Sequence, residues 1–310
     1  MTPVAHVIDF VYDRLQIESE WAVRDSNGFT WWPGPLALRV WAGPGREVQG
    51  VELTPVHIES ALLTGVDATE STLAQLAGIN RLATLSAYQW TPEERVLRLR
   101  ASVSVTEDNW PLARLLALHA AAIQAADAHA EAEPLADVFG GTLAKKVAPK
   151  GGVRTEVDAM LDVISLYRQR GEHGSPWSAD EIAGLVHLDP RPWLRASSEE
   201  RRVEAVLPWD GRQGAHLQID GAFLHPALGS GLLIRLQVPA EPRPDVVQRL
   251  NVAELAEPDA HQLGAWALEE DLGVLFSTFV PAGAYAPNLA RSLVYHAAAR
   301  SDWARATLGE

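Results

Sequence analysis

One internal repeat constrains the fold of this chain more than any other feature of its sequence. The first half contains LARLLALHAAA (residues 112–122) and the second half contains LARSLVYHAAA (residues 289–299), and eight of the eleven positions are identical. Each segment follows an apolar, strand-like run and a short loop that holds an aromatic residue and a proline. Self-similarity of this kind is the sequence signature of a repeated structural unit. The sequence therefore predicts two copies of one fold in a single chain.

Hydrophobic periodicity predicts the same order of elements in both halves. In the first half we expect a helix at 3–17, strands at 20–24, 29–32, 36–42 and 47–56, a helix at 68–79, a hairpin around 91–93 and a helix at 111–131. In the second half we expect a helix at 154–170, strands at 203–209, 215–220 and 232–238, a helix at 244–256, a hairpin around 270–271 and a helix at 287–305. The predicted class is α+β, with two tandem α-β-β-β-α-β-β-α domains, each an antiparallel sheet flanked by helices.

A basic segment near the middle of the chain suggests the domain boundary. The only lysines of the sequence, Lys145, Lys146 and Lys150, lie in GGTLAKKVAPKGGVRT (140–155), which is rich in glycine and has no acid. Such a composition is typical of a linker. We therefore expect domains at 1–140 and 153–310 joined by a linker at 141–152, and the lysines are candidate contacts for a polyanion.

The second half is the longer one, which indicates an insertion near 171–200. Within it, Ser178 precedes Glu181 by three residues. This spacing is a capping box and predicts a short helix that begins after the serine.

Charge and composition exclude several classes of function. The net charge of −14 disfavours direct nucleic-acid binding through a basic face. Without cysteine the chain has no disulfide, thiolate nucleophile or Cys-ligated zinc, and it fits a reducing compartment. The first residues lack the basic start of a signal peptide. No uncharged apolar run reaches the length of about 18 residues that a membrane-spanning helix needs. We expect a cytoplasmic protein that does not contact membranes.

Residues with chemical potential are scattered rather than arranged in motifs. Ser230 lies between two glycines, which favours a loop or bulge over a nucleophile because the spacing is not G-x-S-x-G. A polar loop holds three side chains that bind metals elsewhere, but without a second cluster it favours a solvated loop over a metal site: Glu257, Asp259 and His261. We assign no catalytic residue, metal or cofactor.

The local sequence of the second half carries a family resemblance. The strand Gly264-Ala265-Trp266 runs through a tight acidic turn into GVLFSTFVP and then the helix PNLARSLVYHAAA, and the first half has Trp90-Thr91-Pro92 at its hairpin. With the element order, these features resemble the YbjN-like fold, which is also the type III secretion chaperone-like fold, in two tandem copies. The resemblance implies a non-enzymatic chaperone-like or adaptor protein that binds a segment of a partner protein. Relatives of this kind usually work as dimers, so we expect a homodimer.

Two adjacent tryptophans are the candidate partner-binding residues. Successive side chains of a strand point to opposite faces, so Trp31 and Trp32 face opposite sides of their sheet. Trp31 aligns with Phe29 and is expected in the core, whereas Trp32 is expected to face solvent and bind the partner, which the acidic chain predicts to be basic. The alternative is that both faces are covered.

Two other classes of function remain open. One is a nucleic-acid-associated accessory protein that uses the basic segment and exposed aromatic side chains. The other is a hydrolase that uses Asp, Glu and His side chains, which requires a pocket where several of them converge.

Overall fold

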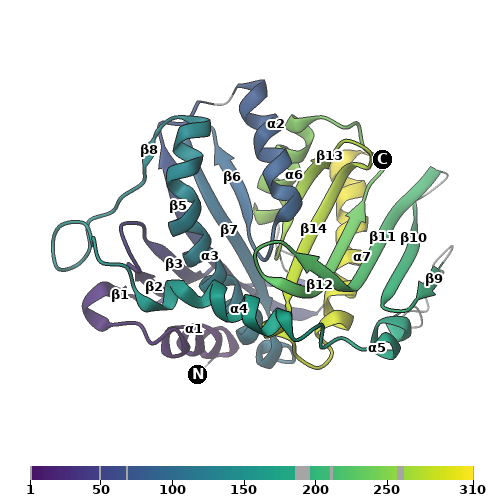
Figure 1. Cartoon of the computed structure of the whole chain (residues 1–310), viewed down its shortest axis with the longest axis horizontal. Helices are drawn as coiled ribbons and strands as arrows, with labels where there is room; N and C mark the ends of the chain where they lie inside the picture. Colours follow the sequence, from purple (N-terminus) through teal and green to yellow (C-terminus); the bar gives the residue numbers. More distant parts are fainter. Residues whose placement is uncertain are drawn as a thin grey trace. The chain divides into compact units, whose positions relative to one another are not determined.

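The computed structural model describes residues 2–48, 50–67, 69–185, 196–209, 212–256 and 262–309 (Figure 1). Its described residues form antiparallel sheets flanked by helices, so the α+β class is confirmed. The chain divides into two compact units. The first unit comprises Met1–Thr72, Leu85–Val163 and Glu254–Leu263, and the second comprises Leu73–Thr84, Ile164–Ala253 and Gly264–Glu310.

The first unit is built on one sheet. Its strands are β1 (Ala22–Arg24), β2 (Gly28–Trp31), β3 (Leu38–Ala42), β4 (Arg46–Val48), β5 (Val51–Thr64), β6 (Ala87–Thr91), β7 (Val96–Val105) and β8 (Thr142–Leu143). Its helices are α1 (Pro3–Arg14) and α3 (Trp110–Phe139), with 3₁₀ turns η1 (Ser19–Trp21) and η3 (Ala159–Asp162). The strand order is β1-β2-β3-β5-β7-β6, and β4 and β8 both pair with β5.

The second unit is built on another sheet. Its strands are β9 (Ala196–Glu199), β10 (Arg202–Trp209), β11 (Arg212–His225), β12 (Gly229–Gln237), β13 (Ala265–Glu269) and β14 (Gly273–Pro281). Its helices are α5 (Ala179–Gly184), α7 (Leu289–Leu308) and nearly all of α4 (Val163–Glu172), with 3₁₀ turns η2 (Asn80–Leu82) and η5 (Ala282–Ala284). Two helices straddle the division between the units: α2 (Glu70–Ile79) and α6 (Pro244–Ala256). The strand order is β13-β14-β12-β11-β10-β9.

The two sheets have the same strand order. Counted from the last hairpin, β6-β7-β5-β3-β2-β1 corresponds to β13-β14-β12-β11-β10-β9. The repeated sequence motif begins the helix after the second strand of each series, in α3 after β7 and in α7 after β14. The copies of the motif therefore occupy equivalent topological places, as a repeated unit requires.

The unit boundary in the structure falls between Val163 and Ile164. Residues 141–152 pack within the first unit. The division of the chain into domains at 1–140 and 153–310, each able to fold by itself, stays a prediction.

Each unit includes a short segment from the other half of the sequence. The segment before β6 belongs to the second unit, where Phe279 N donates to Thr84 O at 3.2 Å. The segment before β13 belongs to the first unit, where Ser102 N donates to Gln262 O at 3.0 Å. Phe279 is on β14 and Ser102 is on β7. Each bond therefore continues the pairing of the longer hairpin strand beyond the end of its shorter partner, β13 or β6. Either unit is therefore completed by residues from both halves of the sequence.

The core of the first unit follows from strand alternation. Phe29 and Trp31 of β2 lie opposite Val40 and Leu38 of β3, and all four side chains are buried. Helix α1 begins at a capped end, where Thr2 Oγ1 accepts from Ala5 N at 3.4 Å. It buries Val7, Ile8 and Val11, the stripe that its periodicity predicts.

Helix α3 is longer than the sequence pattern indicates. The expected helix at 111–131 continues to Phe139 and passes through Pro134. Proline removes one backbone hydrogen bond, but the surrounding alanines and leucines favour the helix. The helix ends at Gly140, whose φ of 71° is accessible to glycine.

The helix expected at 154–170 begins later than predicted, since the turn η3 precedes α4 at Val163. The short helix of the insertion is confirmed as α5, and Ser178 Oγ accepts from Glu181 N at 3.1 Å. Residues 186–195 of the insertion lie outside the described residues, and β9 lies at its end.

Polar side chains tie the helices of the second unit to its sheet. Asn251 of α6 bonds both backbone groups of Trp266, accepting from its N–H at 2.9 Å and donating to its carbonyl at 2.8 Å. Trp209 Nε1 donates to Ser301 Oγ of α7 at 2.9 Å. The Trp266 and Trp303 rings also lie 6.3 Å apart, so the face of the sheet that carries Trp209 and Trp266 packs against α7. In the part of the chain that the structure describes, no helix is long and apolar enough to cross a membrane.

A carboxyl group on α3 makes the stability of the first unit depend on pH. Burial, with a smaller contribution from nearby Glu131, raises the pKa of Asp127 from 3.8 to about 7. The unfolded chain therefore loses this proton at a lower pH than the folded chain. The contribution of Asp127 to the unfolding free energy therefore falls as the pH rises from about 4 to about 7 and does not change above that.

We expect Asp127→Asn to remove this dependence. Between pH 5 and pH 8 the wild type should lose about 2 kcal/mol of unfolding free energy that the variant keeps, allowing for partial solvent access. Urea unfolding followed by circular dichroism at the two pH values measures the difference. Equal losses in both proteins would contradict the raised pKa.

Candidate functional site

One face of the second sheet is covered, and the opposite face is open over β10 and β11 but buried over β13 and β14. Odd-numbered residues of β10, such as Ala205 and Leu207, are buried on the side of Trp209. Even-numbered residues point to the opposite side, which we call the open face. There Glu204 is exposed and Val206 is half-buried.

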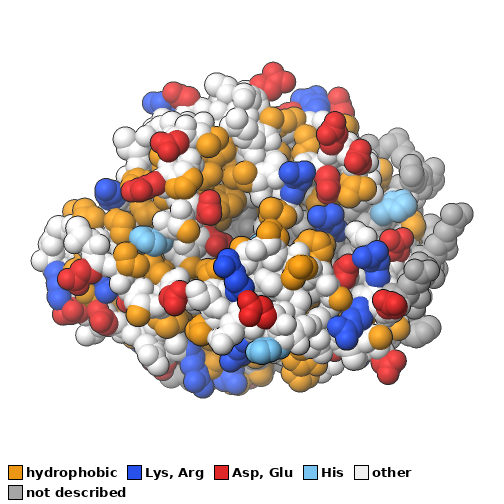
Figure 2. Space-filling model, in the orientation of Figure 1, with side chains coloured by type: hydrophobic (Ala, Val, Ile, Leu, Met, Phe, Trp, Pro, Cys, Tyr) orange, Lys and Arg blue, Asp and Glu red, His pale blue; other side chains and the backbone are white. Residues whose placement is uncertain are grey.

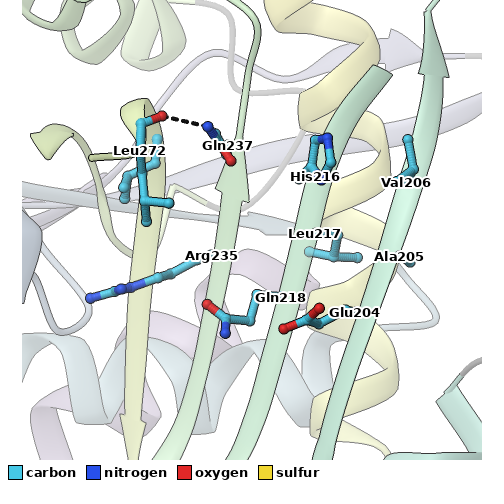
Figure 3. A pocket seen from close by; sticks show the side chains of 10 residues that line it. Glu204, Ala205, Val206, His216, Leu217, Gln218, Arg235, Gln237 and Leu272 are labelled. Carbon is cyan, nitrogen blue, oxygen red and sulfur yellow. Dashed lines mark hydrogen bonds between the residues drawn. The ribbon is translucent and has the colours of Figure 1, made fainter. Parts of the chain in front are cut away.

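A hollow of about 510 Å³ lies on this open face (Figure 3). Its lining comes from β10, β11, β12 and β14 and the turn before β14: Glu204, Ala205, Val206, His216, Leu217, Gln218, Arg235, Gln237, Leu272 and Leu275. A smaller cavity of about 200 Å³ shares His216 and Gln237 with it and is also lined by Gly214, Val238 and Pro239. The hollow and the smaller cavity share these side chains of β11 and β12.

Strand register arranges the lining in two rows that run across the strands. The first is a polar row, in which Glu204 lies opposite Gln218 and Gln218 opposite Arg235. The second is a mixed row two residues further along β10, consisting of Val206, His216, Gln237 and Leu275. The rows are about 6.7 Å apart, because side chains on one face of a strand are two residues apart.

The charges of the polar row are unequally compensated. Arg235 Nη1 lies 3.5 Å from Glu269 Oε2, and the Arg235 side chain is 20% exposed. Figure 3 shows this side chain extending across β14, away from Glu204. Within the described residues, no basic side chain pairs with Glu204. The hollow therefore presents an exposed carboxylate.

The mixed row provides apolar surface and amide groups. Leu275 is fully buried, so the accessible apolar surface of this row comes from Val206, which lies beside His216 in Figure 3. Gln237 Nε2 donates to Leu272 O at 2.5 Å, which ties β12 to the turn before β14. The side-chain oxygen of Gln237 and the amide of Gln218 can bond to groups in the hollow.

The equivalent face of the first sheet is filled by its own side chains. Counted from the hairpins, Arg100 of β7 is equivalent to Ser277 of β14, and Arg98 to Leu275. Glu59 bridges both arginines, with Nε to carboxylate distances of 3.3 Å for Arg98 and 3.0 Å for Arg100. At these places the second sheet has the shorter side chains of Leu275 and Ser277, and both are fully buried.

An aromatic pair lies beside this ion cluster. Trp41 and His57 have ring centroids 5.2 Å apart, and the Arg39 guanidinium lies 4.8 Å from the Trp41 ring. Burial, with a smaller contribution from Arg100, lowers the pKa of His57 from 6.5 to about 4. The imidazole is therefore neutral at pH 7 and packs as part of the sheet.

The two tryptophans expected to bind the partner are both buried. Trp31 is 0% exposed and lies in the core, as predicted. Trp32 was expected to face solvent, and this is wrong, because it is only 7% exposed. It packs with Ala37, Ala148 and the partly buried Trp21. Neither indole offers a contact surface for a partner in this structure.

The segment that covers Trp32 is the one read as a linker. Gly151 and Gly152 have φ values of 83° and 82°, which glycine adopts without strain, and Ala148 N donates to Gly152 O at 2.9 Å. This turn places Ala148 on the indole. Arg154 Nη1 donates to Trp32 O at 2.7 Å, closing the segment over the ring.

The three lysines are not equivalent. Lys145 and Lys146 are exposed. Lys150 forms an ion pair with Glu20, and its Nζ lies 4.8 Å from the Trp21 ring. The acid comes from a distant part of the sequence, so the local composition did not reveal it. A polyanion contact through these lysines stays a prediction.

The other sequence candidates do not form a reactive site among the described residues. Ser230 Oγ donates to Gly171 O at 2.7 Å, in accord with the loop or bulge interpretation. Glu257, Asp259 and His261 lie outside the described residues. Over the described ranges, no group of three or more metal-ligating side chains is suited to hold an ion.

Comparison with protein-family models, curated proteins and solved structures found no significant match. Sequence reasoning missed the hollow because its residues form no motif. The sequence signal related to the hollow was the alternation of polar and apolar residues in β10, β11 and β12. This alternation predicts strands but not which strands pair with one another.

We expect Trp32→Ala to destabilise the first unit. Removing a buried tryptophan leaves a cavity and should cost about 3–5 kcal/mol of unfolding free energy. Urea unfolding followed by circular dichroism measures this loss. Val147→Ala is the matched control in the same segment, because Val147 is 68% exposed and its truncation should change stability by less than about 0.5 kcal/mol. Similar effects for the two variants would mean that the segment does not cover the indole in solution.

We also expect His57 to reduce stability at acid pH. Because its pKa is lower in the folded chain, stability falls as the pH drops from about 6.5 to about 4. Between pH 7 and pH 5 the wild type should lose about 1–2 kcal/mol more than His57→Gln. Denaturant unfolding at both pH values tests this, and parallel losses would show that the imidazole titrates normally.

Proposed function

We propose that this chain is a non-enzymatic, chaperone-like or adaptor protein that binds a segment of a partner polypeptide in the hollow of the second sheet. The observation that carries the proposal is the composition of the hollow. Amides, one carboxylate and one imidazole lie beside aliphatic side chains in about 510 Å³ on an open sheet face. A polypeptide presents the complementary groups, namely backbone amides and carbonyls together with apolar and charged side chains.

The open form of the hollow favours a polypeptide over a small molecule. Small-molecule sites usually bury 70–90% or more of the ligand. Here Glu204 and His216 at the rim are exposed, so a small ligand would keep much of its surface in water. A polypeptide can insert two or three side chains while its backbone remains at the rim.

A binding role also fits the polar groups better than a catalytic role. Arg235 is paired with Glu269, and Gln237 is bonded to the chain itself. Acidic and basic side chains are interspersed on the face in Figure 2, and no observation favours the nucleic-acid alternative.

The resemblance to YbjN-like and secretion chaperone-like proteins remains part of the proposal. It is supported by the common strand order of the two sheets. With it we propose a cytoplasmic location, which the lack of cysteine suits, and a homodimer with two-fold symmetry. Light scattering tests the assembly, since a mass near the 33.7 kDa of one chain would contradict a dimer.

A displayed library of random 12-residue peptides tests the proposed function. Peptides selected on the wild type should lose at least tenfold in affinity for Gln218→Trp, because the indole occupies the centre of the hollow. They should bind Leu224→Trp within about twofold of the wild type, because Leu224 is 72% exposed and is not part of the lining. Fluorescence anisotropy with labelled peptides measures both.

Two results would contradict the proposal. One is a selection that enriches no peptide on the wild type. The other is a set of enriched peptides that bind Gln218→Trp and the wild type equally. A thermal melt of each variant confirms that it is folded before binding is compared.

A further inference from the structure

We infer that the bound segment is extended and carries a lysine or arginine two positions from an aliphatic residue. This inference rests on the proposed function and specifies its ligand. It is drawn from the two rows of the hollow: the polar row has the carboxylate of Glu204, with which no described basic side chain pairs, and the mixed row has the apolar side chain of Val206. The basic side chain lies at Glu204 and the aliphatic side chain lies over Val206, which is half-buried.

The charge of the hollow selects the basic residue. Arg202 and Arg235, whose described side chains lie on the same face as Glu204, already have acidic partners. Arg202 Nη2 lies 3.0 Å from Asp220 Oδ2, and Arg235 Nη1 lies 3.5 Å from Glu269 Oε2. Glu204, Arg235 and Glu269 together carry one net negative charge. An exposed carboxylate with this surrounding attracts a cation and repels an acidic segment.

The spacing of the rows selects the extended conformation and the two-residue interval. Glu204 and Val206 are two residues apart on β10, which separates their side chains by about 6.7 Å along the strand. An extended ligand that runs along the strands has the same interval between side chains on one face. In a helix, residues two apart do not share a face. The rows therefore match a basic-x-aliphatic or aliphatic-x-basic pattern.

The charge of the whole chain acts in the same direction. The net charge is −14, so a basic segment is attracted before it reaches the hollow. A test must therefore separate recognition of the basic residue by Glu204 from attraction of the peptide by the net charge of the whole chain. A control variant with the same net charge is needed.

The test uses three proteins and the same random 12-residue library. On the wild type we expect selected peptides to be enriched in Lys or Arg two positions from Leu, Ile, Val or Met. On Glu204→Lys the basic position should change to Asp or Glu while the aliphatic position stays. On Glu47→Lys, which alters the net charge equally at an exposed site of the first unit, the wild-type pattern should persist.

A charge-swap experiment with one selected peptide provides the matched measurement. Replacing its basic residue by Glu should lower affinity for the wild type and restore it for Glu204→Lys. Glu204→Gln should lower affinity for the original peptide two- to fivefold, the range expected for an exposed ion pair. Glu47→Lys should not distinguish the two peptides in this way.

The outcomes separate this inference from the proposed function. Suppose that peptides are selected and that Gln218→Trp weakens their binding. If these peptides show no preference for a basic residue, or if Glu204→Lys does not change that preference, the inference is wrong and the proposed function stands. If no peptide is selected, or if Gln218→Trp has no effect, both fail. A pattern with the basic and aliphatic residues three or four apart would contradict the extended conformation.

Discussion

The register of β12 between β11 and β14 determines which side chains meet on the open face of the second sheet. Arg235 lies opposite Gln218 on one side and Ser277 on the other, and Gln237 lies between His216 and Leu275. A shift of one residue would send this set to the face that packs against α7. Burial of Leu232, Ile234 and Leu236 on that face therefore also positions the polar residues of the hollow.

The two sheets show how one topology supports two different surfaces. In the first sheet, Arg98 and Arg100 reach across to Glu59 and fill the face with ion pairs. At the equivalent places the second sheet has Leu275 and Ser277, which are shorter. The hollow of the second sheet lies beside Gln218 and Gln237, on the strands that correspond to β3 and β5. Function of the kind proposed therefore depends on divergence between the copies and not on the fold that they share.

Segment 141–154 shows where reasoning from local composition reaches its limit. Its glycines, lysines and lack of acid are typical of a linker, yet it folds over Trp32 and becomes part of the first unit. The acids that balance it, Glu18 and Glu20, lie more than a hundred residues earlier in the sequence. Loop-closing contacts of this kind leave no periodic signal, so a strand pattern placed Trp32 in solvent and the structure buries it.

The sequence by itself determined the α+β class, the positions of most helices and strands and the place of the repeated motif in α3 and α7, but it did not predict β8 or β9. These properties depend on periodicity and on turn and capping residues, which are local. The helix at 244–256 and the cap at Ser178 were predicted in this way, whereas the end of α3 beyond Pro134 was not. Tertiary structure alone decided the exchange of segments between the units, the burial of Trp32 and the hollow beside Glu204. Each of these depends on which strands and loops become neighbours, and alternation along one strand carries no information about the side chains that lie opposite it.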